Sequence, residues 1–401
     1  MNKRINIYYF GEIGVYNEYC PAYVCDKNFV GEILYLISKD GPFTISKEEI
    51  IKTLNINLST FEDIIEALKR INLIDIKDKY YKVNFPVFLE KDLEILDDTL
   101  GNIGRSIGDM IIKNKEYIYN KLTLLSSYNF FTKERLLYHI ICDDIFDGTA
   151  LEYFGEKGLF CVSKPQPDDR NYIVIGYEDN EVVESYSNKL LCSSNNYRSN
   201  GFTFNSFGDS NGERKDMYRF FRMTQKSLED STKSQNLNLA YIKIIDNKNK
   251  EIAEQCGKLV LKISDSQIGY TNLTETEKEL ADFLKKLNYI SFDKNTDIIS
   301  INVPIFIQSD RKIINELSTF ILDGIFETVK ELFRDFEKDA KDITAIQHKV
   351  NIKEILNELW HQVFGLTNEY LVDKGFVEAP KHLNWEGRYF QSLIINCSSA
   401  S

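Results

Sequence analysis

The strongest constraint on the fold of this 401-residue chain is an internal repeat. The stretch 61–76 (FEDIIEALKRINLIDI) aligns with 277–292 (EKELADFLKKLNYISF). The run VNFPVF then matches INVPIF further along the chain, which places Pro86 and Pro304, two of only seven prolines, in register. Because self-similarity over a fixed period marks repeated structural units, the sequence predicts two related copies of one unit.

Further matches follow in the same order. The heptapeptide EYFGEKG at 152–158 matches EYLVDKG at 369–375, and an arginine shortly before a tyrosine recurs at Arg170 and Arg388. This order predicts a tandem duplication whose copies pack about a pseudo-twofold axis, as the subunits of a homodimer do. The range 179–235 has no counterpart, so it is expected to be an insertion or a linker.

Each copy begins with a pattern that predicts helices followed by a β-hairpin. In the first copy, 29–38 carries apolar residues at helical spacing, and Ser46 with Glu49 forms a capping-box pattern at the start of a second helix. Ser59 can cap a third helix. The runs LIDI and YYKVNF, separated by a polar DKD turn, predict two short strands. The inward stripe of the third helix is expected to consist of Phe61, Ile64, Ile65, Leu68 and Ile71.

This order of elements resembles the winged helix-turn-helix superfamily, to which many transcriptional regulators belong. The resemblance rests on residues 46–85 in the first copy and on 272–303 in the second, where 274–288 takes the place of the third helix. Such proteins set the third helix in the major groove and the wing on the DNA backbone, so the resemblance implies DNA binding. Winged-helix modules also serve as platforms for proteins and peptides, and that alternative stays open.

After each hairpin, a proline and an apolar residue lead into a long amphipathic helix, predicted at 89–125 and 308–338. Further helices are expected at 132–154 and 351–371, and short strands at 160–162, 172–177 and 389–395. The predicted fold is therefore α+β and predominantly helical. Its expected parts are a β-rich N-terminal segment (1–27), a first winged-helix-like domain (28–88) with its extension (89–178), the insertion (179–235), and a second winged-helix-like domain (236–306) with its extension (307–401).

Composition and charge limit the partners. The net charge of −12 restricts any nucleic-acid contact to a local basic patch. Glu12 interrupts the N-terminal apolar stretch, and no window approaches the roughly 20 apolar residues that span a bilayer. A cytoplasmic protein without a membrane partner is therefore expected. The seven cysteines lack paired CxxC spacings, so we expect buried thiols, no metal site and no cofactor.

The motifs of the commonest enzyme mechanisms are missing: the sequence has no Gly-rich phosphate loop, no HExxH and no GxSxG. We therefore expect no catalytic function. His139 and Cys142 lie one helical turn apart, which leaves a nucleophile pair or a metal site as an alternative to simple helix packing. Gly101, Gly104 and Gly108 follow a helical pattern and are expected to permit close helix packing or a kink.

The resemblance implies that DNA-binding residues lie on the third helices and on the wings. The N-terminal halves of these helices normally meet base edges, yet they carry Asp63 and Glu66 in one copy and Glu279 and Asp282 in the other. Carboxylates repel DNA apart from an occasional contact to cytosine, so the side chains partly oppose the implied activity. The candidates are Thr60, Lys69, Arg70, Lys77, Lys79, Lys82, Lys278, Lys285 and Lys286.

The range 179–235 has the most unusual local composition. Between 194 and 226, basic residues outnumber acidic ones and alternate with aromatic residues. This interleaving suits single-stranded nucleic acid or an anionic peptide, through stacking and cation–π contacts. The alternative is a hairpin whose aromatic side chains pack on a neighbouring domain. The candidate partner-binding residues are Tyr197, Arg198, Phe202, Phe204, Phe207, Arg214, Lys215, Arg219 and Arg222.

These observations favour a cytoplasmic transcriptional regulator that binds double-stranded DNA as a single-chain pseudo-dimer, either as a monomer or as a homodimer. The alternative is a non-catalytic scaffold that binds a protein or a peptide through its winged-helix modules, with the insertion as its contact loop.

Overall fold

The computed structural model describes residues 3–14, 17–183, 186, 194–208, 239–266, 268–293, 296–380 and 387–393. The fold is α+β and mostly helical, and its strands form small sheets. The chain divides into two compact units, each assembled from three separate stretches. Unit 1 comprises 1–107, 150–190 and 325–367, whereas unit 2 comprises 108–149, 191–324 and 368–401.

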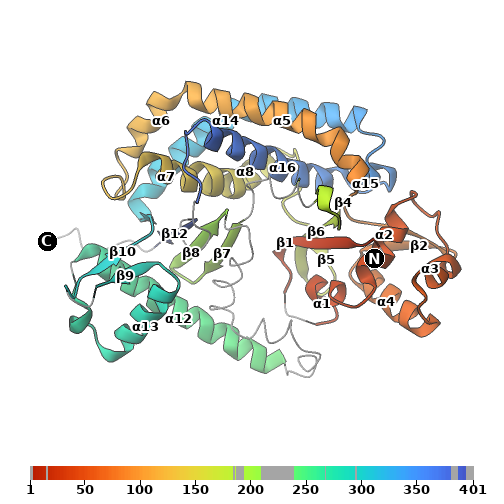
Figure 1. Cartoon of the computed structure of the whole chain (residues 1–401), viewed down its shortest axis with the longest axis horizontal. Helices are drawn as coiled ribbons and strands as arrows, with labels where there is room; N and C mark the ends of the chain where they lie inside the picture. Colours follow the sequence, from red (N-terminus) through yellow and green to blue (C-terminus); the bar gives the residue numbers. More distant parts are fainter. Residues whose placement is uncertain are drawn as a thin grey trace. The chain divides into compact units, whose positions relative to one another are not determined.

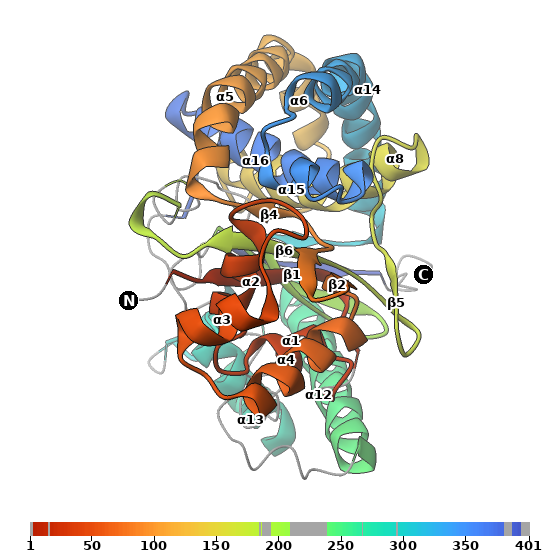
Figure 2. The same ribbon diagram turned by 90° about the vertical axis from the view of Figure 1, so that its right-hand side faces the viewer.

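The sheet of unit 1 is organised around strand β6 (Arg170–Glu178). β6 pairs antiparallel with β1 (Ile5–Glu12) and parallel with β4 (Val87–Phe88), and Figure 2 shows β1 and β6 side by side. The short strand β5 (Pro165–Gln166) pairs with the start of β6. The predicted strand at 172–177 is therefore confirmed as the centre of a sheet, and the N-terminal segment supplies its neighbour.

Unit 1 also contains three helices followed by a hairpin, which we call module 1 and which is red to orange in Figure 1. Its core includes the whole predicted stripe of the third helix. The predicted capping box of Ser46 and Glu49 is present. The third helix begins earlier than expected because the side chain of Asn57, not Ser59, caps it by accepting the Thr60 N–H. The elements of module 1 are α2 (Val30–Ser38), α3 (Lys47–Leu54), α4 (Leu58–Arg70), β2 (Ile74–Lys77) and β3 (Tyr80–Val83), and the short α1 (Pro21–Cys25) precedes them.

The remaining helices of unit 1 come from distant parts of the sequence. Trp360 is completely buried among them, with its ring centroid 4.8 Å from that of Phe154. The helices are the first part of α5 (Glu90–Lys113), α8 (Ala150–Glu156), the last part of α14 (Gln308–Asp339), α15 (Thr344–Gln347) and most of α16 (Ile352–Asp373).

The sheet of unit 2 has the order β11, β12, β8, β7. β12 (Arg388–Ser392) is parallel to β11 (Ile305–Phe306) and antiparallel to β8 (Phe202–Phe207), which in turn pairs with β7 (Ser194–Arg198). β7 and β8 fall inside the range 179–235, which was expected to be an insertion or linker. That expectation is corrected here, because β8 holds the same position beside β12 that β1 holds beside β6.

Unit 2 contains its own helices and hairpin, which we call module 2. It is green to teal in Figure 1. Module 2 consists of α12 (Leu239–Asp265), the 3₁₀ turn η3 (Tyr270–Asn272), α13 (Glu275–Lys286), β9 (Ile290–Phe292) and β10 (Ile299–Ile301). Unit 2 further includes α6 (Lys115–Leu122), α7 (Lys133–Leu137) and the π-helix η1 (Tyr138–Thr149).

The contiguous domains expected from sequence therefore differ from the observed units. Helices α5 and α14 each begin in one unit and end in the other. The 24 residues of α5 give it a length of about 36 Å. The single helix predicted at 89–125 is divided at Asn114 into α5 and α6, and the helix predicted at 132–154 contains η1.

Several backbone hydrogen bonds recur in both units. The Gly176 N–H donates to the Pro86 carbonyl at 2.9 Å, and the Phe390 N–H donates to the Pro304 carbonyl at 2.9 Å. Gly176 and Phe390 therefore occupy matching positions in their sheets. The predicted match of Arg170 with Arg388 fails this test, because Arg170 lies six residues before Gly176 and Arg388 only two before Phe390.

A buried aspartate also recurs at the start of each long helix. In unit 1, Asp92 accepts the Leu89 N–H at 2.7 Å and the Thr344 N–H at 2.9 Å. In unit 2, Asp310 accepts the Ile307 N–H and the Ser126 N–H, both at 2.9 Å. Each carboxylate thereby joins the start of a long helix to a turn from the other half of the sequence, and neither is more than 1% exposed.

Two of the three glycines in the first long helix lie at close helix contacts, as expected. In unit 1, a Cβ built on Gly104 would lie 3.1 Å from the Thr367 nitrogen. In unit 2, a Cβ on Gly108 would lie 2.4 Å from the ring of Tyr370. Side chains at these positions would force the helices apart.

Candidate functional site

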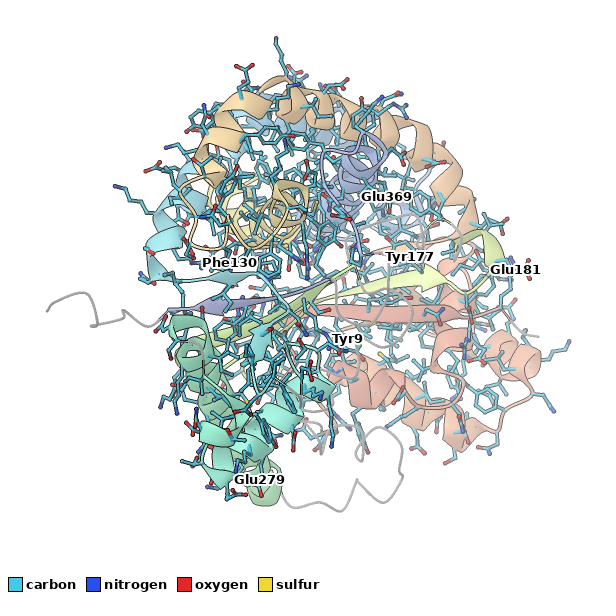
Figure 3. The ribbon with its side chains drawn as sticks, turned by 60° about the vertical axis from the view of Figure 1, so that its left-hand side comes forward. Tyr9, Phe130, Tyr177, Glu181, Glu279 and Glu369 are labelled. Atoms are coloured by element: carbon cyan, nitrogen blue, oxygen red, sulfur yellow. The ribbon has the colours of Figure 1, made fainter. Side chains whose placement is uncertain are left out.

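Helices α4 and α13 each bury one face in their module and leave the other exposed. On α4, Glu62, Asp63 and Glu66 are exposed, and Glu62 forms an ion pair with Lys47 at 2.7 Å. On α13, Glu279 points away from the helix into solvent, as Figure 3 shows. The acidic outward faces noted in the sequence are therefore present on both helices.

Most of the predicted DNA-binding cations of module 1 are exposed. Lys69 and Arg70 lie in the last turn of α4, and Lys77 and Lys79 lie on either side of the turn between β2 and β3. Among the described residues, none of these four forms an ion pair with a carboxylate within 4.0 Å. Lys82 differs, because it pairs with Asp75 at 3.1 Å.

The backbone of Thr60, the remaining candidate of module 1, is part of the helix cap. Its N–H donates to the Asn57 side chain at 2.8 Å, and the residue is half-buried. Thr60 therefore marks the first turn of α4, which in a helix that enters a DNA groove is the end nearest the bases.

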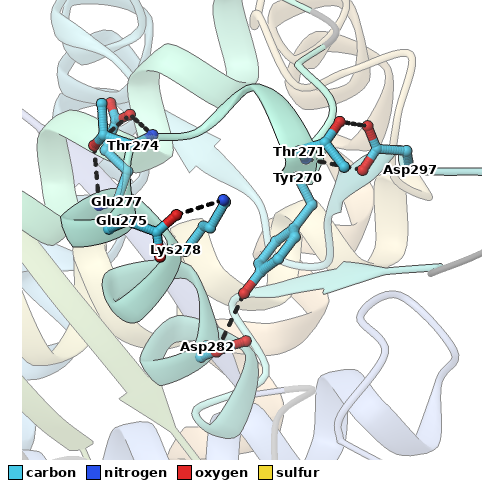
Figure 4. A network of polar contacts seen from close by, with 8 residues as sticks. All are labelled: Tyr270, Thr271, Thr274, Glu275, Glu277, Lys278, Asp282 and Asp297. Carbon is cyan, nitrogen blue, oxygen red and sulfur yellow. Dashed lines mark hydrogen bonds and ion pairs between the residues drawn. The ribbon is translucent and has the colours of Figure 1, made fainter.

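The cations of module 2 are largely engaged within the module. The ammonium group of Lys278 lies 2.8 Å from Glu275, which raises the pKa of the lysine (Figure 4). The ammonium group of Lys285 lies 3.7 Å from the ring centroid of Phe292, in a cation–π contact. Lys286 is exposed. Of the three predicted candidates in module 2, Lys286 alone is exposed without such a contact.

Polar contacts also occupy the surface around α13 (Figure 4). The Tyr270 hydroxyl donates to Asp282 at 3.3 Å, and the Thr271 N–H donates to Asp297 at 2.9 Å. Thr274 and Glu277 form a capping box. These bonds fix carboxylates beside the outward face of the helix, so this surface is acidic and ordered by its own side chains.

The predicted partner-binding aromatics do not form an exposed loop. Tyr197, Phe202, Phe204 and Phe207 are buried, and the first three belong to the core of module 2. The alternation of aromatic and polar residues is the period of a strand: Tyr197 faces the core while Arg198 is exposed. Hence the alternative of a hairpin packed on its neighbour describes β7 and β8. The other candidates, Arg214, Lys215, Arg219 and Arg222, lie outside the described residues.

The pair singled out for catalysis, His139 and Cys142, is completely buried on η1. Burial lowers the pKa of the imidazole well below its ordinary value and raises that of the thiol well above its own. Both shifts favour the neutral forms, whereas a nucleophilic cysteine needs a thiolate. A thiolate–imidazolium pair is therefore disfavoured here.

Sequence reasoning missed two buried polar groups beneath the sheets. In unit 1, the Tyr177 hydroxyl at the end of β6 (Figure 3) donates to Glu358 and accepts from Gln362 at 2.8 Å. In unit 2, Gln391 on β12 donates to Asp144 on η1 at 2.8 Å. No sequence motif marks them, because each joins residues more than 180 positions apart.

Comparison with known proteins gives no relative: no family model, no curated protein and no solved structure matches the chain. Within the described ranges, no cluster of three or more His, Cys, Asp or Glu side chains is placed to hold a metal ion. In the same ranges, no helix combines the length and the apolarity needed to cross a membrane.

Proposed function

We propose that the chain is a DNA-binding transcriptional regulator whose phosphate contacts come from module 1. The observation that supports this most is the placement of Lys69, Arg70, Lys77 and Lys79, which are exposed on α4 and on the adjoining hairpin and form no ion pair within 4.0 Å with a carboxylate of the described residues. Lysine and arginine supply most phosphate contacts, and a local basic surface of this kind is what an acidic protein needs to hold a duplex.

In this proposal both modules are winged helices that arose by duplication. The order of helices and hairpin in each module supports the winged-helix assignment. The bonds from Gly176 to Pro86 and from Phe390 to Pro304 support the duplication, because they recur at matched prolines. The protein would act in the cytoplasm as a single-chain pseudo-dimer in which only one half has kept a phosphate-binding surface.

A second function, binding of a protein or peptide, is favoured by the acidic faces of α4 and α13. Glu279 and Asp282 are exposed on α13, as Asp63 and Glu66 are on α4. A partner with a basic segment would complement these faces. In that case module 2 would dock the partner and DNA would not bind at all, so one experiment can separate the two functions.

The test is fluorescence anisotropy of a labelled duplex from the gene's own upstream region, with a scrambled duplex beside it, at two salt concentrations. Four phosphate contacts predict a slope of log K against log salt of about −3 to −4. The double variant Lys69→Glu with Arg70→Glu should abolish the preference for the native duplex, whereas Asp63→Ala, on the same helix, should not weaken it.

Failure of the wild-type protein to bind either duplex at low salt would end the regulator proposal. Binding that ignores the Lys69→Glu and Arg70→Glu changes would also end it, because the contacts would then lie elsewhere. In either case, capture of a basic peptide that depends on Glu279 and Asp282 becomes the decisive measurement for the second function.

A further inference from the structure

Helix η1 and the sheet of unit 2 enclose a polar cluster that none of the proposed DNA contacts uses. Side chains alternate along a strand, so Tyr389 and Gln391 of β12 share the face opposite to that of Phe390, which joins the core of module 2. η1 is a π-helix of 12 residues, a rare structure that is frequent at functional sites. Its wide turn brings His139, Asp143 and Asp144 onto one face.

The two adjacent aspartates have different surroundings. Asp144 is held by Arg311 at 3.2 Å and by Gln391 at 2.8 Å. Asp143 is almost completely buried and has the Tyr389 hydroxyl as its side-chain partner, and no basic group in the described part of the chain forms an ion pair with it. Burial, with Asp147 and Asp144 nearby, raises its pKa well above the ordinary value. Asp143 is therefore a buried carboxyl without an ion-pair partner among the described residues, although the charge of Arg198 lies near it.

His139 provides a second, independent sign that the cluster is incomplete. It is completely buried, and within the described ranges neither ring nitrogen has a hydrogen-bond partner. Its ring lies against that of Tyr389, the residue that bonds Asp143, with 5.0 Å between the ring centroids. A buried polar group without a partner costs about 1–3 kcal/mol, so a hydrogen bond from a bound molecule to the His139 imidazole would be favourable.

The matching place in unit 1 holds a different set of side chains, in which one buried carboxyl, Glu358, lies near His361. Tyr177 and Gln391 each follow the residue that donates to the matched proline carbonyl, and each is bonded at 2.8 Å to the helix beneath it. The helix residue is Gln362 in unit 1 and Asp144 in unit 2. The residue before it is His361 in unit 1 and Asp143 in unit 2, so a cationisable side chain stands where unit 2 has a carboxyl.

We propose that the cluster around Asp143 binds a small ligand that carries a protonated amine or guanidine group. The charged group would pair with the Asp143 carboxylate, and the rings of Tyr389 and Tyr138 would supply cation–π contacts at its side. The inference does not rest on DNA binding.

The experiment uses the purified full chain without DNA. Isothermal titration and thermal unfolding are measured with putrescine, spermidine and L-arginine, with NaCl at matched ionic strength and with 1,4-butanediol, which resembles putrescine in length but carries no charge. At least one of the amines should raise the midpoint of unfolding in a concentration-dependent way, and butanediol should not. Asp143→Asn should weaken that amine at least tenfold, and Asp147→Asn should weaken it less.

The matched control is Glu358→Gln in unit 1, which removes a buried carboxyl from the corresponding region and should leave the amine affinity unchanged. Circular dichroism verifies that each variant is folded. The proposal is overturned if none of the three amines raises the midpoint beyond NaCl, or if Asp143→Asn binds the amine as tightly as the wild-type protein does.

Discussion

Modules 1 and 2 follow the same order of helix and hairpin, yet their cations have different surroundings. In module 1, Lys69 and Lys77 extend into solvent without an ion pair. In module 2, Lys278 is paired with Glu275 and Lys285 covers Phe292. Of these four lysines, the alignment of the two stretches matches only Lys69 with Lys285. The comparison teaches that two modules with similar elements can differ in which cations form close contacts within the module, and under the proposed function only module 1 then supplies phosphate contacts.

The two hairpins also differ in how they are fixed. In unit 1, the imidazole of His348 accepts the Val83 N–H at 3.3 Å, and its other nitrogen lies 3.1 Å from the Ser38 carbonyl. In unit 2, the guanidinium group of Arg135 donates to the Asn302 carbonyl at 3.1 Å. One hairpin is therefore held by a group that must be neutral and the other by a group that is always charged.

The largest expected effect concerns the buried aspartate that each unit has at the start of its long helix. Asp92→Ala would leave the N–H groups of Leu89 and Thr344 without partners, and Asp310→Ala would do the same to Ile307 and Ser126. Each substitution should lower the free energy of unfolding by about 3 kcal/mol, measured by urea denaturation. Asp63→Ala on the surface is the control. A large loss in only one of the two variants would show that these carboxylates are not equivalent.

The next effect tests whether lysines of module 1 contribute more to duplex binding than lysines of module 2. Lys77→Glu with Lys79→Glu should weaken duplex binding about 30-fold, or about 2 kcal/mol, because two phosphate contacts become repulsive. Lys285→Glu with Lys286→Glu changes the same charge in module 2 and should alter the affinity by less than about threefold. Anisotropy titrations of both variants at one salt concentration make the comparison. Equal losses would mean that module 2 also contacts DNA.

Part of the fold could be predicted because its signals are local. Pro86 and Pro304 directly precede β4 and β11, which each pair parallel with a strand of their sheet, and the helical stripe of α4 followed from its spacing. The strands β7 and β8 were missed because their alternating aromatic and polar residues were interpreted as a binding surface, whereas every residue of β8 is buried. No local sequence signal shows that each unit contains helices from distant parts of the chain. Bonds such as that between Asp92 and Thr344 join residues 252 positions apart.

The candidate site was the less predictable part. The lysines could be placed on helix and hairpin from the sequence, but whether each faces a carboxylate or solvent depends on packing. Lys285 illustrates this, because its ammonium group lies over the ring of Phe292 on the following strand. The polar cluster around Asp143 could not be found at all, since Tyr389 and Gln391 reach it from a strand almost 250 residues later.

The third prediction uses pH to separate the two hairpins. Burial lowers the pKa of His348 to about 4, against an ordinary value of 6.5. The unfolded chain therefore takes up the proton first, so the contribution of this contact is complete above pH 6.5 and is lost as the pH falls toward 4. At pH 5 the loss is about 2 kcal/mol.

Hydrogen exchange followed by mass spectrometry, corrected for the intrinsic effect of pH, should show the 73–85 peptide opening at pH 5 while the 289–302 peptide does not. His348→Asn should remove this difference in pH response. If both peptides open equally at pH 5, the distinction between a neutral and a charged anchor is wrong.

The smallest effect concerns the N-caps of α4 and α13, and it distinguishes a loss of folding stability from a loss of affinity for the duplex. Asn57 caps α4 through the Thr60 N–H, and Thr274 caps α13 through the Glu277 N–H. Asn57→Ala and Thr274→Ala should each cost about 1 kcal/mol of stability, since each removes one N-cap bond. Only Asn57→Ala should also lower the affinity for the duplex, by about twofold, because it frays the helix end that meets DNA under the proposed function. Equal affinity in the two variants, measured where both are folded, would place the contact away from the first turn of α4 and confine it to the hairpin and the last turn.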